Sequence, residues 1–398
     1  MTTFVRLDTP LQPLATVPAF ALWQLGFRPF FLLASSFAAV SALAWALQYA
    51  GALGHPYLQG PMWHAHEMLF GFALAVVVGF LLTAGRNWSN QPTPTGMPLA
   101  AMALLWVAGR VLVLTPFGWA AAIVNAAFPL TAAIALAIPL LAARNRRNYF
   151  FVGLLLAMSA ATLSVHLAEL GVLRMPAWIG IRLALDIVLF IMAVMAGRVI
   201  PMFTGNGVPG ASPKRHPALE KAALGSVLLL LAADALQAHG TLLAALTAFC
   251  AAVHFSRWLL WQPWKTTRVP LVWVLHAAYL WIPVHLALRC LAELDLAAPS
   301  AATHALTAGA VGGLVIGMMT RTAKGHTGRP LRADRADVTC YLLILAGASV
   351  RVFGPLVMPT LTVPSVVASA ALWSAGFGLF AVRYWPVLTR ARLDGKPG

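Results

Sequence analysis

Long apolar runs alternate with short polar segments along the whole chain. Each run holds about 20 mainly apolar residues, enough for a helix to cross the ~30 Å hydrocarbon core of a bilayer. The pattern therefore predicts an all-α polytopic membrane protein of about 12 transmembrane helices. The predicted spans lie near residues 28–48, 64–83, 97–115, 119–143, 148–170, 180–203, 218–238, 241–261, 270–291, 301–320, 338–358 and 362–385.

Composition agrees with this pattern. Of 398 residues, 60% are hydrophobic and 10% are charged, whereas a soluble domain carries roughly 25% charged residues. The longest polar segments, 203–217 and 321–337, are too short for a soluble domain. We expect a single transmembrane domain over residues 1–398, with short cytoplasmic tails at about 1–20 and 386–398. The start of the chain lacks the basic region and cleavage site of a secretory signal, so the first span is expected to be retained.

The formal net charge of +16 could indicate a nucleic-acid partner, but the positions of the charges indicate topology instead. Lys and Arg concentrate in the cytoplasmic loops of membrane proteins. With the amino terminus inside, the even-numbered loops and the carboxyl tail hold sixteen of these residues, and the outer loops hold only Arg174. We therefore predict that both termini are cytoplasmic and that no nucleic acid is bound.

Cysteine usage indicates no disulfide framework and no thiolate zinc site. Cys250, Cys290 and Cys340 all fall inside apolar runs and form no CxxC pair, so they are interpreted as packing residues.

Three spans end in a similar way, with small and aliphatic residues followed by arginine. These endings are GFLLTAGRNW, AVMAGRVIPMF and GLVIGMMTRTAKG, in the second, sixth and tenth spans. A period of four helices predicts three pseudo-symmetric four-helix arcs, with chance similarity between membrane helices as the alternative.

Polar side chains inside a membrane are costly and are therefore candidates for function. The second span opens with His64, His66 and Glu67, and the tenth opens with His304 at the same outer surface. Imidazole is the commonest protein ligand of transition metals and of haem iron. We therefore predict a metal or haem site here; the alternative is that each histidine only bonds a neighbouring carbonyl.

Helix geometry restricts how the opening motif can act. Residues i and i+2 point about 200° apart on a helix, so His64 and His66 are expected to serve different partners. His64 and Glu67, at i and i+3, share a face and are expected to contact each other. The leading hypothesis is a haem iron between the second and tenth spans, with His66 and His304 as axial ligands and His64 as the substitute for His66.

Charged residues near the depth of these histidines are candidates for further roles. Glu67 and Asp186 are predicted to act in the reaction at the metal or haem site, for example by carrying protons. Arg182 and Asp186 are spaced i, i+4, so an intrahelical ion pair is the simpler interpretation. Arg110, Arg182 and Arg289 all lie in the outer halves of their spans, where haem propionates would need cationic partners.

Two further histidines are candidates for metal or cofactor contact. His276 lies among aromatic residues of the ninth span, which suits either a cofactor edge or an aromatic core helix. His326 lies with Arg329 in the loop GHTGRP, whose backbone amides could form an anion-binding nest. The alternative is a charged loop that only sets orientation.

Several of these segments resemble the NnrS family of bacterial membrane proteins. The segments are GFRPFF at 26–31, WHAHEMLFGFALAVVVGFLLTA at 63–84, ARNRRN at 143–148, GRVIPMFTGN at 197–206 and HALTAGAVGGLVIGMMTRTAKGHTGRP at 304–330. The resemblance runs from about residue 20 to 385. It implies a link to nitric oxide and nitrosative stress, bound haem of b type and copper or a second iron, and a place in the bacterial inner membrane. The motif positions that it assigns to this site are His64, His66, Glu67, His276, His304 and His326.

The span count and the histidines on the second and tenth spans are also similar to the catalytic subunit of haem–copper oxidases and nitric oxide reductases. In those proteins, histidines of these two helices hold a haem. This sequence departs from them because no histidine lies on the sixth span and the seventh lacks the histidine pair of the usual second metal.

The leading functional hypothesis is a haem protein that binds nitric oxide and reduces or detoxifies it, as a nitric oxide reductase-like oxidoreductase would. It implies nitric oxide and membrane lipid as partners, with a quinol or a cytochrome as electron donor. The alternatives are a transporter or metal-handling protein, in which the polar residues line a substrate path, and a nitric oxide sensor without turnover.

Overall fold

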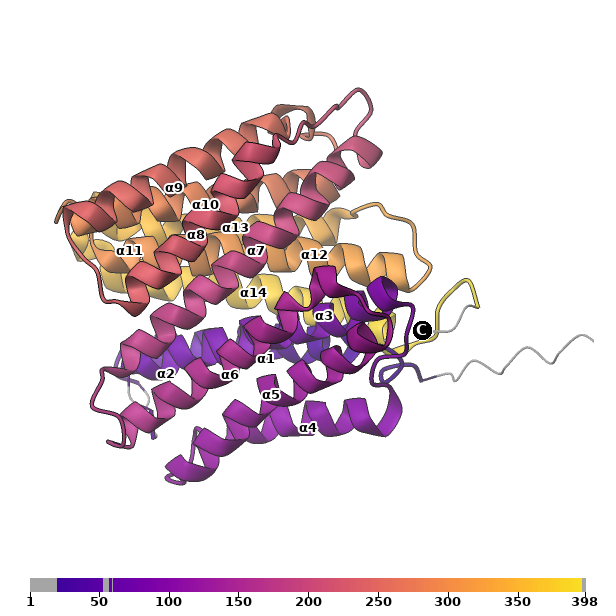
Figure 1. The fold of residues 1–398 in the computed structure, drawn as a ribbon, viewed down its shortest axis with the longest axis horizontal. Coiled ribbons are helices and arrows are strands. Elements are labelled where there is room, and N and C mark those ends of the chain that lie inside the picture. The colour runs from indigo at the N-terminus through magenta and orange to yellow at the C-terminus, as the bar shows by residue number, and fades with distance from the viewer. Residues whose placement is uncertain (1–19, 53–56, 59, 396–398) are drawn as a thin grey trace, which may run out of the picture.

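The computed structural model describes residues 20–52, 57–58 and 60–395, which form a bundle of helices (Figure 1). Within the described residues there is no strand, only an isolated antiparallel bridge between Phe20 and Arg390. The helices are α1 (Phe27–Tyr49), α2 (Gly60–His66), η1 (Glu67–Ala73), α3 (Leu74–Ser89), α4 (Gly96–Leu112), α5 (Gly118–Ala142), η2 (Arg146–Asn148), α6 (Phe150–Glu169), α7 (Ala177–Gly207), α8 (Pro217–Ala235), α9 (Thr241–Leu260), η3 (Pro263–Lys265), α10 (Pro270–Glu293), α11 (Pro299–His304), η4 (Ala305–Val311), α12 (Gly312–His326), α13 (Arg335–Val357), η5 (Pro359–Leu361) and α14 (Thr362–Thr389).

Two of the long helices contain a π-helical segment. The helix from Gly60 to Ser89 consists of α2, η1 and α3, and the helix from Pro299 to His326 consists of α11, η4 and α12. In both cases the π-helix begins directly after a histidine, His66 or His304. π-Helical turns are rare and often mark functional sites, so these two segments single out the second and tenth spans.

Counting each interrupted helix once, the described residues contain twelve long helices, as the hydropathy pattern predicts. Ten of them are long and apolar enough to cross a membrane; α4 is shorter, with 17 residues, and α8 carries charged side chains. Four spans extend by several residues beyond the predicted limits: Gly60–Ser89, Ala177–Gly207, Pro299–His326 and α14, which continues to Thr389. The predicted amino-terminal tail lies almost wholly outside the described residues, and the four-helix period stays a prediction.

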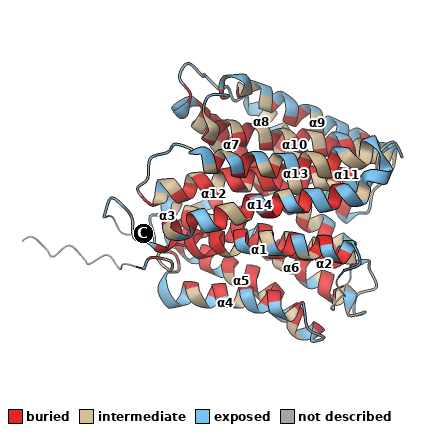
Figure 2. Ribbon diagram, turned by 180° about the vertical axis from the view of Figure 1, so that it is seen from behind, coloured by how far each residue is buried: buried red, intermediate tan, exposed pale blue. Residues whose placement is uncertain are grey.

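The helices run antiparallel to their chain neighbours and enclose the two interrupted helices. The first of these packs on α1 and α5, and the second packs on α10 and α13; α14 lies between α1 and α13. Buried residues gather on the inward faces of these helices, while the outer helices show exposed residues along their length (Figure 2). The Gly60–Ser89 helix is the most buried of the ten.

Large apolar side chains cover much of the outer surface. Leu104 and Val111 on α4, Ile134 and Ile138 on α5, and Val382 on α14 are all exposed. Such a surface would be unfavourable in water, but it matches the hydrocarbon of a bilayer. The fold is therefore that of a multi-pass membrane protein.

The two ends of the bundle differ in chemistry. One end, which we call the basic end, carries the loops at 143–149, 208–216, 261–269 and 327–334, and the end of α14; it lies on the right in Figure 1. The opposite end, which we call the histidine end, is where α2 and α11 begin.

A capping box fixes the start of α13 at the basic end. The Asp334 carboxylate accepts a hydrogen bond from the backbone N–H of Asp337 at 3.0 Å, and the Asp337 carboxylate accepts one from the backbone of Asp334 at 3.0 Å. Burial acts to raise the pKa of Asp334, but the Asp337 amide, Arg383 and Lys324 outweigh it and hold this pKa below its ordinary value. Such a cap satisfies backbone donors that the helix itself leaves unpaired.

Candidate functional site

A cavity of about 590 Å³ lies at the histidine end between the two interrupted helices. Residues of α2 and η1 form one wall, residues of α11 and η4 form another, and α1, α7, α13 and α14 complete the lining. The lining is mostly apolar, and its volume is in the range of small-molecule and cofactor sites. The π-helical segments therefore line a cavity that could hold a ligand.

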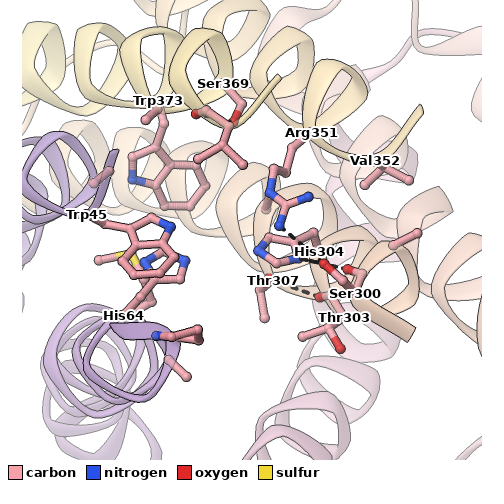
Figure 3. A pocket seen from close by; sticks show the side chains of 18 of the residues that line it. Trp45, His64, Ser300, Thr303, His304, Thr307, Arg351, Val352, Ser369 and Trp373 are labelled. Carbon is pink, nitrogen blue, oxygen red and sulfur yellow. Dashed lines mark hydrogen bonds between the residues drawn. The ribbon is translucent and has the colours of Figure 1, made fainter. Parts of the chain in front are cut away.

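His64 and His304 approach each other across this cavity. Their ring centroids are 6.2 Å apart and their planes differ by 9°. The indole of Trp45 stacks on His64, with ring centroids 4.8 Å apart. Figure 3 shows Trp45 and His64 on one side of the cavity, with His304, Arg351 and Ser300 on the other. The structure thus brings together one histidine from the second span and one from the tenth.

Hydrogen bonds hold the His304 ring in place. Its Nδ1 lies 2.7 Å from the carbonyl oxygen of Ser300, one helical turn earlier. An Nδ1–H that donates to a carbonyl leaves Nε2 as the nitrogen with a free lone pair, which is how metal-binding histidines are commonly oriented. Among the described residues, the buried Nδ1 of His64 has no hydrogen-bond partner. The two imidazoles are therefore held with different rigidity.

His66 lies outside the cavity, although the sequence favoured it over His64 as the partner of His304. It is fully buried, with Nδ1 2.7 Å from Glu67 Oε1 and Nε2 3.1 Å from Nε2 of His166 on α6. His64 and His66 do have different partners, as their i, i+2 spacing predicts. The expected contact of His64 with Glu67 is wrong, because the Glu67 carboxylate turns to His66 where the π-helix begins.

Glu67 belongs to a buried polar network beside η1. Its Oε1 accepts a hydrogen bond from Arg110 Nη1 at 2.5 Å, and Arg110 also donates to Asn125 Oδ1 on α5. Gly71 makes room for this arginine, since a Cβ at position 71 would lie 2.7 Å from Arg110 Nη1. The Trp106 indole donates to the Gly71 carbonyl at 2.9 Å. Arg110 is thus the ion-pair partner of Glu67 and does not line the cavity.

Asp186 lies in a second cluster, formed between α7, α8 and α10. Its nearest ion-pair partner is Arg289, at 3.8 Å, and Arg289 also donates to Asp234. Arg182 lies 3.6 Å from Asp234. The predicted pairing of Arg182 with Asp186 is therefore replaced by cross-helix pairs, which sequence spacing cannot indicate. Arg182 and Arg289 are engaged with carboxylates and do not line the cavity.

The remaining predicted histidines also lie away from the cavity. His276 is buried on α10, with Nε2 2.8 Å from Thr204 Oγ1 on α7. His326 ends α12 at the basic end, where its ring packs 5.6 Å from that of Phe27. The cavity therefore gathers His64 and His304 from the predicted set and leaves out His66, His276 and His326.

A second metal, which the sequence also suggested, would have few candidate ligands. Within the part of the chain that the structure describes, no group of three or more His, Cys, Asp or Glu side chains has an arrangement that could hold a metal ion. His66 and His166 offer two imidazoles whose Nε2 atoms lie 3.1 Å apart. Tyr57 stacks on His166 with ring centroids 6.0 Å apart, and burial together with nearby Glu169 raises the pKa of Tyr57 to about 12.

The sequence did not single out three residues of the cavity. Arg351, Trp45 and Trp373 all line it. Arg351 could have been identified from the sequence, because it lies well inside the apolar run 338–358 and charged residues in a membrane span are candidates for function. The tryptophans carried no such signal, since aromatic residues are common in membrane helices.

Together, the fold and the cavity define a polytopic helical membrane protein with a histidine-bearing ligand cavity near one end of its bundle. Residues 21–392 match the model of the NnrS protein family, and the chain belongs to this family. A comparison with curated proteins gave no significant match.

Proposed function

We propose that this protein is a haem protein of the bacterial inner membrane that binds nitric oxide and reduces it, with the haem held between His64 and His304. The observation that carries the proposal is the approach of these two imidazoles across an apolar cavity of about 590 Å³. Membership of a family associated with the nitric oxide response supports the choice of ligand.

The residues of the cavity fit a haem. His64 and His304 would hold the iron, because imidazole is a common ligand of haem iron and the two rings lie on opposite walls of the cavity. The His64 and His304 centroids are 6.2 Å apart. Aromatic and aliphatic side chains, including Phe72 and Trp373, supply the apolar surroundings that a porphyrin requires. The proposed pair is thus His64 with His304, in which His64 takes the place that the sequence-based hypothesis gave first to His66.

The two histidines are expected to act differently. His304 is held by its hydrogen bond to Ser300, whereas His64 has no partner for Nδ1 among the described residues. If both imidazoles held the haem, one of them would have to move aside for nitric oxide to bind. We assign His64 as the displaceable ligand and His304 as the fixed one.

When bound, the haem would supply the iron that takes up nitric oxide and would pass on electrons received from an external donor. The apolar lining excludes water and admits a small apolar molecule from the lipid. Reduction of two nitric oxide molecules to nitrous oxide and water consumes two electrons and two protons. A quinol or a cytochrome is the class of donor required, and Glu67 and Asp186 are the buried carboxylates proposed to hold protons.

The topology belongs to the same proposal. The four loops at the basic end hold nine lysines and arginines, whereas the described loops at the histidine end hold only Arg174. This difference supports a cytoplasmic location for the basic end and for both termini. The haem cavity would then lie near the periplasmic surface.

Absorption spectra of the purified protein test the proposal. We expect a Soret band, b-type haem on extraction, and a spectral shift when nitric oxide is added to the reduced protein. A protein that is expressed with a full haem supply and still shows no Soret band would refute the haem. A Soret band without nitrous oxide formation from a suitable reductant would restrict the function to binding or sensing.

A further inference from the structure

The cavity wall contains one cationic side chain, Arg351 on α13. Its Nη2 donates a hydrogen bond to Ser300 Oγ at 3.2 Å, and the carbonyl of Ser300 accepts the hydrogen bond from His304. Figure 3 shows the guanidinium directly beside His304. The positive charge therefore lies at the edge of the cavity that also holds the fixed histidine.

Arg351 differs from the other arginines near the histidine end. Arg110 is paired with Glu67, and both Arg182 and Arg289 are paired with Asp234. Among residues 20–52, 57–58 and 60–395, no carboxylate forms an ion pair with Arg351. A half-buried guanidinium inside a membrane is unfavourable without an anionic partner, and here the partner can come from a ligand in the cavity.

The polarity of the cavity is divided between its two sides. Arg351, Ser300 and Thr303 lie on the side of His304, whereas Trp45 lies on the opposite side (Figure 3). Most of the remaining lining is apolar and includes Phe72 and Trp373. This division fits a molecule that has a wide apolar body and carboxylate groups at one end. Guanidinium binds carboxylate through two parallel hydrogen bonds, so arginine suits this role better than lysine.

We propose that Arg351 binds the carboxylates of the cavity's ligand and thereby fixes the direction in which the ligand enters. For the haem assigned above these groups are its propionates, so the identity of the ligand rests on the proposed function. The carboxylate contact does not depend on iron. Through Ser300, the same arginine also positions His304.

The test separates the carboxylate contact from iron binding by using metal-free protoporphyrin and its dimethyl ester. Binding is followed in nanodiscs by quenching of tryptophan fluorescence, because Trp45 and Trp373 line the cavity. The variants are Arg351→Gln and Arg351→Lys. The matched control is Arg174→Gln, which removes an exposed arginine from a loop at the same end of the bundle. Circular dichroism establishes that each variant is folded.

The wild-type protein and Arg174→Gln are expected to bind the diacid at least tenfold more tightly than the diester. Arg351→Gln is expected to bind both with the affinity of the diester, and Arg351→Lys to recover part of the preference. Equal binding of the two porphyrins by the wild type, no binding of either, or an unchanged preference in Arg351→Gln would overturn the inference. A preference that depends on Arg351 in a protein that forms no haem Soret band would instead leave the inference standing and refute the haem.

Discussion

Replacing Arg110 with methionine should strongly destabilise the bundle, because it leaves a carboxylate buried without its cation. Glu67 is 1% exposed, and its Oε1 lies 2.5 Å from Arg110 Nη1 and 2.7 Å from His66 Nδ1. The substitution removes the guanidinium from both Glu67 and Asn125. Breaking a buried pair on one side costs about 3–5 kcal/mol, mainly because the remaining charge stays buried.

The double variant Arg110→Met/Glu67→Leu provides the decisive comparison. Removing both charges also removes the uncompensated one, so the double variant should cost roughly 2 kcal/mol less than Arg110→Met alone. The free energy of unfolding can be measured by reversible denaturation with sodium dodecyl sulfate in mixed micelles, followed by circular dichroism. The single variant Glu67→Leu completes the comparison. The interpretation of this network as a buried ion pair is refuted if Arg110→Met costs less than about 1 kcal/mol. It is also refuted if the cost of the double variant equals the sum of the costs of Arg110→Met and Glu67→Leu.

Three further predictions concern other parts of the molecule. Gly309→Leu in η4 should lower the yield of folded protein in size-exclusion chromatography, because a Cβ at this position would overlap the Trp281 ring. Asp334→Ala should lower the free energy of unfolding by about 1 kcal/mol through loss of the α13 cap. The contribution of this cap should be present above the ordinary pKa of aspartate and be lost as the pH falls through the lower pKa of folded Asp334. Reporter fusions after Ala50 and after Arg147 should lie on opposite sides of the membrane.

Each of these predictions has a clear contrary result. Gly153→Ala is the control for Gly309, since a Cβ at position 153 would meet nothing within 4 Å; equal yields for the two variants would refute the packing argument. A pH profile of Asp334→Ala that matches the wild type down to acidic pH would rule out the cap as the titrating element. Reporters on the same side would refute the topology.

The helices could be predicted from the sequence because the bilayer imposes their length. A span needs about 20 apolar residues, and all twelve predicted runs correspond to helices in the structure. The π-helical turns could not be predicted, since they depend on how neighbouring helices pack. Their effect is local but important, because η1 begins at Glu67 and directs that side chain to His66.

The site could be predicted only in part. The 3.6-residue period shows that His64 and His66 face different ways, but it does not show which of them faces His304, because that depends on the rotation of the helix within the bundle. His64, Met68 and Phe72, spaced i, i+4, i+8, all line the cavity. Cross-helix pairs such as Arg289 with Asp234 could not be predicted either, because nothing in local spacing indicates them.

The central claim is that His64 and His304, and not His66, hold a haem, and spectra of three alanine variants test it most directly. Each variant is purified with a full haem supply and is first shown to be folded by circular dichroism. We predict that His304→Ala loses haem, that His64→Ala keeps it with the spectrum of an iron bound by one histidine, and that His66→Ala keeps the wild-type spectrum. A His304→Ala variant with full haem content and an unchanged spectrum would contradict the account.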